Sequence, residues 1–316
     1  MALEGFARGL WMLGTLGLAA GVASAGPIGS TPGEQNNGSG LGSGGNAPDR
    51  IVLTGIVRDF RADHPDFQRL SRNAAGSAAG GLYARMVHDQ LDAEGKPAFR
   101  SKGYRVTSAW RDAQGRAIMP FAQDKSYYDL RPDDTLGSTE PLGDAVTGEH
   151  TFRQWYRDVP GVNMSKPVSI TLNRDPNSGN YVFDDRTDPV YSQLGGFFPI
   201  NGELYGDYEN GRNYHFTYEL HMNFTYRAGS GQTFTFDGDD DVWVFIDGKL
   251  VIDLGGLHNR MTQTVEIDRL NWLEDGKRYD LRFFFAERHT ADSNFRIETN
   301  IDLRSAPLPV TSGLFD

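Results

Sequence analysis

Three consecutive aspartates, Asp239, Asp240 and Asp241, are the residues of this chain whose type and spacing most clearly indicate chemistry. They run directly into the apolar segment Val242 to Ile246, and no cation lies beside them in the sequence. Adjacent carboxylates repel one another, and each one raises the cost of ionising its neighbours. Such a run persists where water screens it or where a hard cation neutralises it. Calcium suits the second case because it takes roughly six to eight oxygen ligands.

An EF-hand loop does not explain the aspartates. A loop that starts at Asp237 has Val242 where EF-hands need glycine, and Gly248 where they need glutamate. Two interpretations therefore stay open. The run is either part of a different calcium site or a solvated loop that leads into a strand, with Asp241 pointing outward.

The histidines do not predict a zinc site. His215 and His221 lie on one face of a predicted strand, but their spacing along the strand puts them about 20 Å apart, too far to share a metal. His258 and His289 could meet at one end of a β-sandwich. There we expect each to form hydrogen bonds within its loop rather than to bind a metal.

No catalytic motif stands out in the chain. It contains no Gly-x-Ser-x-Gly elbow, no phosphate-binding glycine loop and no His-Glu-x-x-His helix. Cysteine is absent, which excludes thiol catalysis and thiolate metal sites. The 42 carboxylates could form a glycosidase pair in space, but no pair is singled out. We therefore predict a protein that is not an enzyme, with a glycan-active hydrolase as an alternative.

The beginning of the chain predicts export. Leu10 to Ala20 is an apolar run too short to span a bilayer, and Ala23-Ser24-Ala25 is a small-x-small cleavage pattern. Residues 1–25 are therefore interpreted as a signal peptide, with a membrane anchor as the alternative. Residues 26–48 are rich in glycine, serine and asparagine, which is typical of a flexible linker. We expect a secreted or cell-surface protein without membrane insertion after signal cleavage. The net charge of −11 argues against nucleic acid as a partner.

The segments that must position these residues are predicted to be almost all β. Tyr214 to Tyr226 alternates apolar and polar residues strictly, which indicates a long strand with one buried and one exposed face. Asp247-Gly248 is a two-residue hairpin turn between Asp241–Ile246 and Lys249–Asp253. Ser77 to Gln90 is the one predicted helix. Further strands are expected at 51–57, 104–110, 168–172, 278–286 and 294–303, with long loops between 111 and 211. This pattern favours an all-β sandwich or jelly roll.

The stretch from Asp237 to Gly256 resembles the core of the PA14 family, and more closely that of its fibro-slime branch. The matching residues are Gly238-Asp239-Asp240-Asp241-Val242-Trp243-Val244-Phe245-Ile246-Asp247-Gly248-Lys249-Leu250 and Ile252-Asp253-Leu254-Gly255-Gly256-Leu257-His258. Shorter matches lie at 54–60, 64–67, 152–156, 197–199, 214–217, 283–289 and 293–299. The resemblance implies a single β-sandwich module at 49–305, with its core at 166–303 and a tail at 306–316.

The resemblance also implies a calcium site. In sugar-binding PA14 proteins, two adjacent aspartates joined by a cis peptide hold a calcium ion, which contacts sugar hydroxyls. The matching pair here is Asp239-Asp240, while Asp241 stands where many relatives have glycine. A second calcium loop would follow the strand that ends at Ala286, with Glu287 as a ligand and Asn294 or a loop carbonyl in support. Glu287 could equally pair with Arg288 or Arg282 at the surface.

The resemblance implies a calcium-dependent carbohydrate-binding module of the lectin or adhesin type. Its partners would be extracellular glycans or a matrix polysaccharide. The candidate ligand-binding residues around the ion are Asp241, His258, Arg288 and His289. Trp272 or Tyr205 could provide an aromatic platform for a sugar, whereas Trp243 and Phe245 are predicted to be core. A structural surface or matrix protein, in which calcium only stabilises a loop, is the main alternative.

Overall fold

Strands make up nearly all the regular structure of the protein. The computed structural model describes residues 47–68, 80–120, 128–141 and 143–307. Within these residues there are two four-residue helices, α1 (Glu149–Phe152) and α2 (Tyr191–Leu194), and one short 3-10 turn. No helix in the same ranges has the length and apolar character needed to cross a membrane. The predicted all-β class is confirmed, whereas the predicted signal peptide and nearly all of the linker lie outside the described residues.

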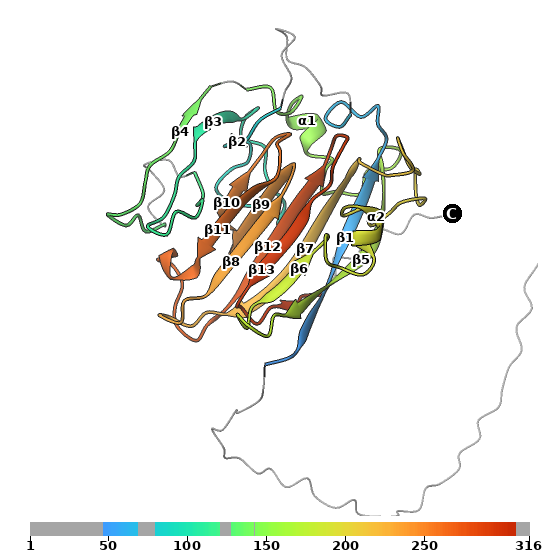
Figure 1. Ribbon diagram of the computed structural model, residues 1–316. Coiled ribbons are helices and arrows are strands. Elements are labelled where there is room, and N and C mark those ends of the chain that lie inside the picture. Colours follow the sequence, from blue (N-terminus) through green and yellow to red (C-terminus); the bar gives the residue numbers. More distant parts are fainter. Residues whose placement is uncertain (1–46, 69–79, 121–127, 142, 308–316) are drawn as a thin grey trace, which may run out of the picture. The chain divides into compact units, whose positions relative to one another are not determined.

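Eleven strands form one large antiparallel sheet (Figure 1). Their order is β10 (Lys249–Leu254), β9 (Asp241–Ile246), β12 (Arg278–Glu287), β7 (Phe216–Thr225), β1 (Arg50–Phe60), β5 (Asn163–Arg174), β6 (Tyr181–Asp184), β13 (Phe295–Thr299), β8 (Thr233–Gly238) and β11 (Met261–Glu266). β14 (Arg304–Ser305) pairs with β7 outside this path. A second sheet has three strands, β2 (Tyr83–Ala84), β3 (Tyr104–Ser108) and β4 (Ser138–Glu140). Each predicted strand is present, and β5 is longer than predicted because it pairs with the whole length of β1.

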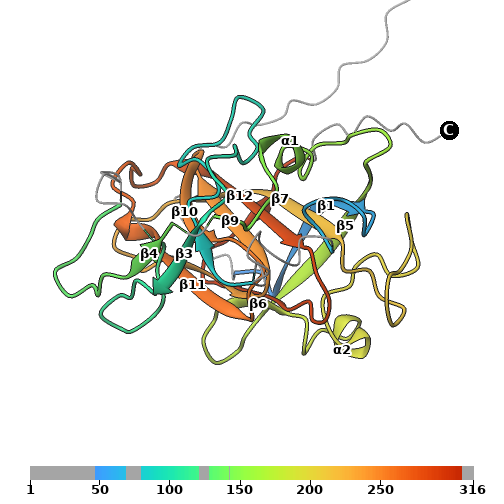
Figure 2. The same cartoon turned by 90° about the horizontal axis from the view of Figure 1, so that it is seen from above.

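The large sheet folds over so that two of its parts pack face to face, as the view from above shows (Figure 2). Ring contacts join strands that are distant in the sheet order. Phe283 of β12 lies 5.5 Å from Phe236 of β8, and Phe285 lies 5.2 Å from Phe295 of β13, measured between ring centroids. The interior of the sandwich is therefore strongly aromatic. Burial of this apolar surface is the main source of stability in a chain without disulfides.

The outer face of β9 and β12 is also covered. Trp243 of β9 contacts Trp155 and Phe152, with ring centroids 6.1 Å and 5.6 Å away. Tyr156 meets Phe284 of β12 at 4.9 Å. α1 and the residues just after it thus form a third layer. The prediction that Trp243 and Phe245 belong to the core is confirmed by their complete burial.

This third layer explains why one prediction about β7 is wrong. Its alternation predicted an exposed polar face, but Thr217 and Glu219 on that face are buried. Thr217 Oγ1 donates a hydrogen bond to the carbonyl oxygen of Trp155 at 2.6 Å. Glu219 forms ion pairs with Lys96 and Arg58. Thr217 and Glu219 therefore have partners inside the protein instead of facing water.

The predicted helix at Ser77 to Gln90 is also wrong within the part of it that is described, 80–90. There the chain forms β2 and separate bridges to its neighbours. The backbone nitrogen of Tyr83 donates to the carbonyl oxygen of Gly255 at 2.6 Å, and Gly255 donates back at 2.8 Å. The backbone of this segment is thus paired with the end of β10 instead of with itself.

One end of the sheet brings together the segments that carry the aspartates. There β8 ends beside the start of β13, and β9 starts beside the end of β12, with Gly238 opposite Phe295 and Asp241 opposite Ala286. The chain enters the module at the opposite end, where Arg50 pairs with Asn173 (Figure 1). The hairpin turn between β9 and β10 has positive φ at Asp247 and Gly248, as predicted for a primed turn.

Candidate metal centre

The aspartates form the tight connection between β8 and β9. Asp240 has a positive φ of 53°, which turns the chain so that neighbouring carboxylates point in different directions. The cis peptide among the described residues lies at Thr290–Ala291, so the Asp239–Asp240 bond is trans. The cis bond expected from the resemblance is therefore wrong here, and the left-handed residue makes the turn instead.

Gly238, the last residue of β8, allows the two loops to approach. A Cβ atom at this position would lie 2.2 Å from the carbonyl oxygen of Asn294. We expect Gly238→Ala to lower the free energy of unfolding by about 3 kcal/mol, because overpacking forces the backbone apart. Urea denaturation measures the loss. Gly148→Ala is the control, since no atom lies within 4 Å of a Cβ there, and its effect should stay below about 0.5 kcal/mol. Equal losses would contradict the steric explanation.

Asp239 is bound entirely by Asn294. The Asn294 backbone nitrogen donates to Asp239 Oδ1 at 2.5 Å, and Asn294 Nδ2 donates to Oδ2 at 2.7 Å. Asn294 Oδ1 in turn accepts from Arg260 Nη1 at 3.3 Å, and Arg260 forms a bidentate ion pair with Asp237. These contacts join the β8–β9 turn to the β12–β13 loop. No sequence pattern indicated the pair of Arg260 and Asp237, because only the pairing of β11 with β8 brings them together.

Glu287 is fully buried beside Asp240 and Asp239. Its Oε2 atom has no hydrogen-bond partner by geometry, its Oε1 accepts a long bond of 3.4 Å from the His289 backbone nitrogen, and the side chains of Ser293 and Asp240 lie close enough to shift its pKa. Burial, followed by repulsion from Asp240 and Asp239, raises the pKa of Glu287 well above its ordinary value. Burial likewise raises the pKa of Asp240, whose Oδ2 accepts from the Arg288 backbone nitrogen at 2.9 Å. The structure thus places two strongly perturbed carboxyls side by side.

Asp241 and Arg288 form a fully buried ion pair, with 2.6 Å between Arg288 Nε and Asp241 Oδ2. Arg288 Nη1 also donates to the carbonyl oxygens of Asp66 at 2.8 Å and Ala145 at 3.0 Å. Its guanidinium lies 4.8 Å from the ring centroid of Trp155. The interpretation with Asp241 pointing outward is therefore wrong. Asp241 points inward to Arg288, and Arg288 is held there by Asp66, Ala145 and Trp155.

The alternative surface pairing of Glu287 is wrong as well. Arg288 is committed to Asp241, and Arg282 Nη1 donates to the carbonyl oxygen of Gly95 at 3.0 Å. Neither arginine forms an ion pair with Glu287 within the described ranges. Asp241 and Arg288 are both 0% exposed. Their predicted contact with a ligand stays untested, and their burial indicates a structural role in joining the loops to the third layer.

The two histidines take part in separate hydrogen-bond networks. His258 Nδ1 lies 2.9 Å from its partner, the carbonyl oxygen of Asn259, and burial lowers the pKa of the ring. His289 Nδ1 lies 2.7 Å from the carbonyl oxygen of Thr290, and its Nε2 lies 3.1 Å from Gln68 Nε2. Loop hydrogen bonding is thus confirmed for both, whereas their role in ligand binding stays a prediction.

The two proposed aromatic platforms each carry a cation on a ring face. Lys249 Nζ lies 4.5 Å from the ring centroid of Trp272, and the Arg61 guanidinium lies 4.5 Å from that of Tyr205. A sugar could stack on either of these faces only if the cation moved away. The structure therefore gives neither ring an open platform on that face.

The charges at this end of the sheet do not balance. Of the four carboxyls of Asp239, Asp240, Asp241 and Glu287, only that of Asp241 forms an ion pair with a described residue. Asp239 and Asp240 are 6% exposed and Glu287 is 0% exposed, so water screens them little. Carboxyl oxygens without a counter-ion fit a hard cation such as calcium, whose binding favours their ionised form. In the described part of the chain, however, no three acidic or histidine side chains already surround one point as metal ligands do. Both Asp239 oxygens instead face Asn294.

Fold and site together define an all-β sandwich module with a carboxylate-rich end. Residues 199–305 match the family model described as the PA14 domain. The matched range includes the three aspartates and the loop that carries Glu287 and Asn294. The resemblance to PA14 inferred from the motif is confirmed.

Several proteins of Dictyostelium discoideum are similar to this chain. Protein psiD is 41% identical over 263 residues, which cover 81% of this chain and 42% of psiD. Protein psiC is 39% identical over 167 residues, covering 50% of this chain and 30% of psiC. The chain spans less than half the length of these relatives. Neither the family description nor the relatives' names state an enzymatic activity.

Solved structures add little to this comparison. A β-glucosidase from Kluyveromyces marxianus in complex with glucose is 10% identical, and the alignment covers 71% of this chain and 18% of the enzyme. The TM-score is 0.20, which is too low to bear on fold or function.

Proposed function

We propose that this protein is a secreted or cell-surface module that binds extracellular carbohydrate through a calcium ion, without turnover. The observation that carries the proposal is the buried group of Asp239, Asp240 and Glu287, none of which forms an ion pair with a described residue, although the charge of Arg288 acts on Asp240. An acidic cluster alone would be weak support. The unpartnered, fully buried Oε2 atom of Glu287 strengthens it, because such an atom is costly unless a ligand satisfies it.

Asp239, Asp240 and Glu287 would supply carboxylate oxygens to the ion, and calcium would offer a positive centre for sugar hydroxyls. Asn294 positions Asp239 through two hydrogen bonds, and at least one of them would have to break so that an Asp239 oxygen could bind the ion. Arg288, through Asp241, holds the loop next to Glu287 against the third layer. The binding end also lies opposite the point where the chain enters β1.

A structural role for calcium is the second candidate. The carboxylates are at most 6% exposed, so an ion among them would have little open surface for a sugar. In that case the ion would only stabilise the two loops of a surface or matrix protein. The two candidates predict the same calcium binding but different sugar binding.

Calcium calorimetry on Asp240→Asn tests the site. We expect the wild type to bind calcium and Asp240→Asn to bind at least tenfold more weakly, because one charged ligand is lost. Asp247→Asn is the matched control, since it removes an exposed charge in a hairpin turn that accepts asparagine. Equal calcium binding by all three proteins would show that the cluster is not the site.

Retention of the protein on a panel of immobilised glycans then separates the two candidates. The lectin proposal expects retention in calcium, release by EDTA and no retention of Asp240→Asn. Calcium binding without retention on any glycan would support the structural role instead.

A further inference from the structure

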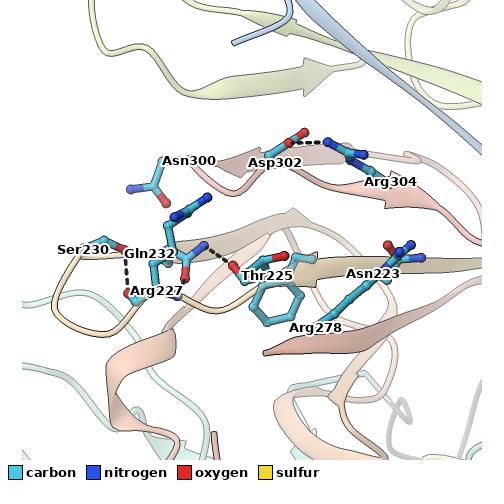
Figure 3. A pocket seen from close by; sticks show the side chains of 10 residues that line it. Asn223, Thr225, Arg227, Ser230, Gln232, Arg278, Asn300, Asp302 and Arg304 are labelled. Atoms are coloured by element: carbon cyan, nitrogen blue, oxygen red, sulfur yellow. Dashed lines mark hydrogen bonds and ion pairs between the residues drawn. The ribbon is translucent and has the colours of Figure 1, made fainter. Parts of the chain in front are cut away.

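A second candidate site lies at the opposite end of the sheet from the acidic cluster. It is a hollow of about 420 Å³ at the end of β7, the start of β12 and the segment that follows β13. Figure 3 shows its lining, which is almost entirely polar. β8 starts at this end and reaches the acidic cluster only at its other end, Gly238. The two sites are therefore separate.

The hollow is cationic in a protein whose net charge is −11. Three arginines line it, and the single acidic residue of the lining is Asp302. Arg304 Nη2 contacts Asp302 Oδ2 at 3.3 Å. The guanidinium groups of Arg227 and Arg278 form no ion pair or hydrogen bond with a described residue. Planar guanidinium groups without a partner are suited to bind carboxylate or sulfate, which accept two parallel hydrogen bonds.

Asn223 adds an independent sign of a ligand. It lies in β7 and is only 7% exposed, yet its Oδ1 atom has no hydrogen-bond partner. The strand register places Arg304 of β14 directly opposite Asn223, and Arg278 of β12 opposite Thr225. Because alternate residues share a face, Asn223, Thr225 and Arg278 lie on the same face of the sheet. An unpartnered acceptor between two arginines suits a ligand that carries both a hydroxyl and an anionic group.

The walls of the hollow are fixed by hydrogen bonds that do not involve these groups. Gln232 Nε2 donates to the carbonyl oxygen of Thr225 at 3.1 Å, and Gln232 Oε1 accepts from the Arg227 backbone nitrogen at 2.8 Å. Asn300 Oδ1 accepts from the Thr233 backbone nitrogen at 2.8 Å. The backbone around Arg227 is thus held in place before any ligand arrives, which lowers the cost of binding.

We propose that this hollow binds an acidic saccharide. Its carboxylate or sulfate group is held by Arg278, which Figure 3 shows beside Asn223, and one of its hydroxyls donates to Asn223 Oδ1; Arg227, at the other side of the hollow, binds a second acidic unit of the same saccharide. This binding needs no calcium, because all the groups that contact the ligand are protein side chains at the end remote from Glu287. The protein would thus have a second glycan contact besides the proposed calcium site.

Calorimetry in EDTA with three oligosaccharides of equal length tests the proposal: one uronate, one sulfated and one neutral. We expect an acidic oligosaccharide to bind and the neutral one not to bind. The double variant Arg227→Gln/Arg278→Gln should reduce the affinity at least tenfold. Arg153→Gln/Arg105→Gln removes the same charge from two arginines outside the hollow and should bind like the wild type. Comparison of the uronate with the sulfated ligand identifies the preferred anion.

Two further measurements separate a built site from general attraction between charges. Asn223→Ala should bind the acidic oligosaccharide about tenfold more weakly than the wild type. Its weak binding of inorganic sulfate should be unchanged, since sulfate has no hydroxyl to donate. Equal weakening by both arginine double variants, or no effect of Asn223→Ala, would overturn the proposal. Asp240→Asn should bind the acidic oligosaccharide like the wild type, so failure of the calcium site and failure of this one are distinguishable.

Discussion

Arg288→Met is expected to lower the free energy of unfolding by about 3–5 kcal/mol, the cost of leaving a buried charge without its partner. Asp241 and Arg288 are both 0% exposed and lie 2.6 Å apart. Methionine fills part of the volume of the arginine and can still pack on Trp155, so loss of packing is limited. Urea denaturation followed by tryptophan fluorescence measures the change.

A double variant shows whether the orphaned charge is the cause. In Asp241→Asn/Arg288→Met neither member of the pair is charged, so the double variant should be more stable than the single variant. The hydrogen bonds from Arg288 to the carbonyl oxygens of Asp66 and Ala145 are lost in the single and in the double variant. Their loss therefore does not contribute to the difference in stability between the two. Arg282→Met is the control, since Arg282 forms no ion pair with a described residue. A double variant no more stable than Arg288→Met would refute the electrostatic explanation.

Glu287→Gln is expected to have opposite effects with and without calcium. In EDTA the variant should be more stable than the wild type, because it removes one of three carboxylates that repel one another inside the protein. With calcium at about 100 times its dissociation constant, the wild type should gain about 2.7 kcal/mol, and the variant should gain much less. Thermal unfolding in EDTA and in calcium measures both effects.

The advantage of Glu287→Gln in EDTA should depend on pH. Burial and repulsion raise the pKa of Glu287 in the folded state, so the folded wild type holds a proton that the unfolded chain releases. Wild-type stability from this group is therefore lost as pH rises from the ordinary carboxyl range toward the folded pKa. Glutamine cannot lose a proton, so the difference should grow with pH. Glu274→Gln, at an exposed surface pair, is the control. If calcium stabilised Glu287→Gln as much as it stabilises the wild type, Glu287 would not be a calcium ligand.

Much of the fold could be predicted because its signals are local. The alternation in β7 indicated a strand, and Asp247-Gly248 indicated a primed turn, since both depend on neighbouring residues only. The motif around the aspartates likewise identified the PA14 domain. The helix predicted at Ser77 to Gln90 was wrong because the hydrogen-bond partners of this segment are distant in the sequence. The backbone of Tyr83 is paired with Gly255, which lies far away in the sequence.

The candidate site was predictable in its members but not in its electrostatics. Motif matching brought Asp239, Asp240, Glu287 and Asn294 together, and the sheet register places them at one end. The roles within this set depend on partners that no local pattern specifies. Asp239 is bound by Asn294, which is held by Arg260 from another strand, and Glu287 is left without a partner atom for its Oε2.

The sequence by itself determined that this chain is a β-sandwich whose run of three aspartates leads into a hairpin, because strand period and turn chemistry are properties of adjacent residues. Only the tertiary structure decided that the three carboxylates differ. Asp241 has a buried arginine, Asp239 has an asparagine, and Asp240 shares its surroundings with Glu287. The physical reason is that burial and charge compensation depend on side chains brought together over long stretches of chain. Packing of the third layer and strand register decide which side chains meet, and no short segment of the sequence determines either of them.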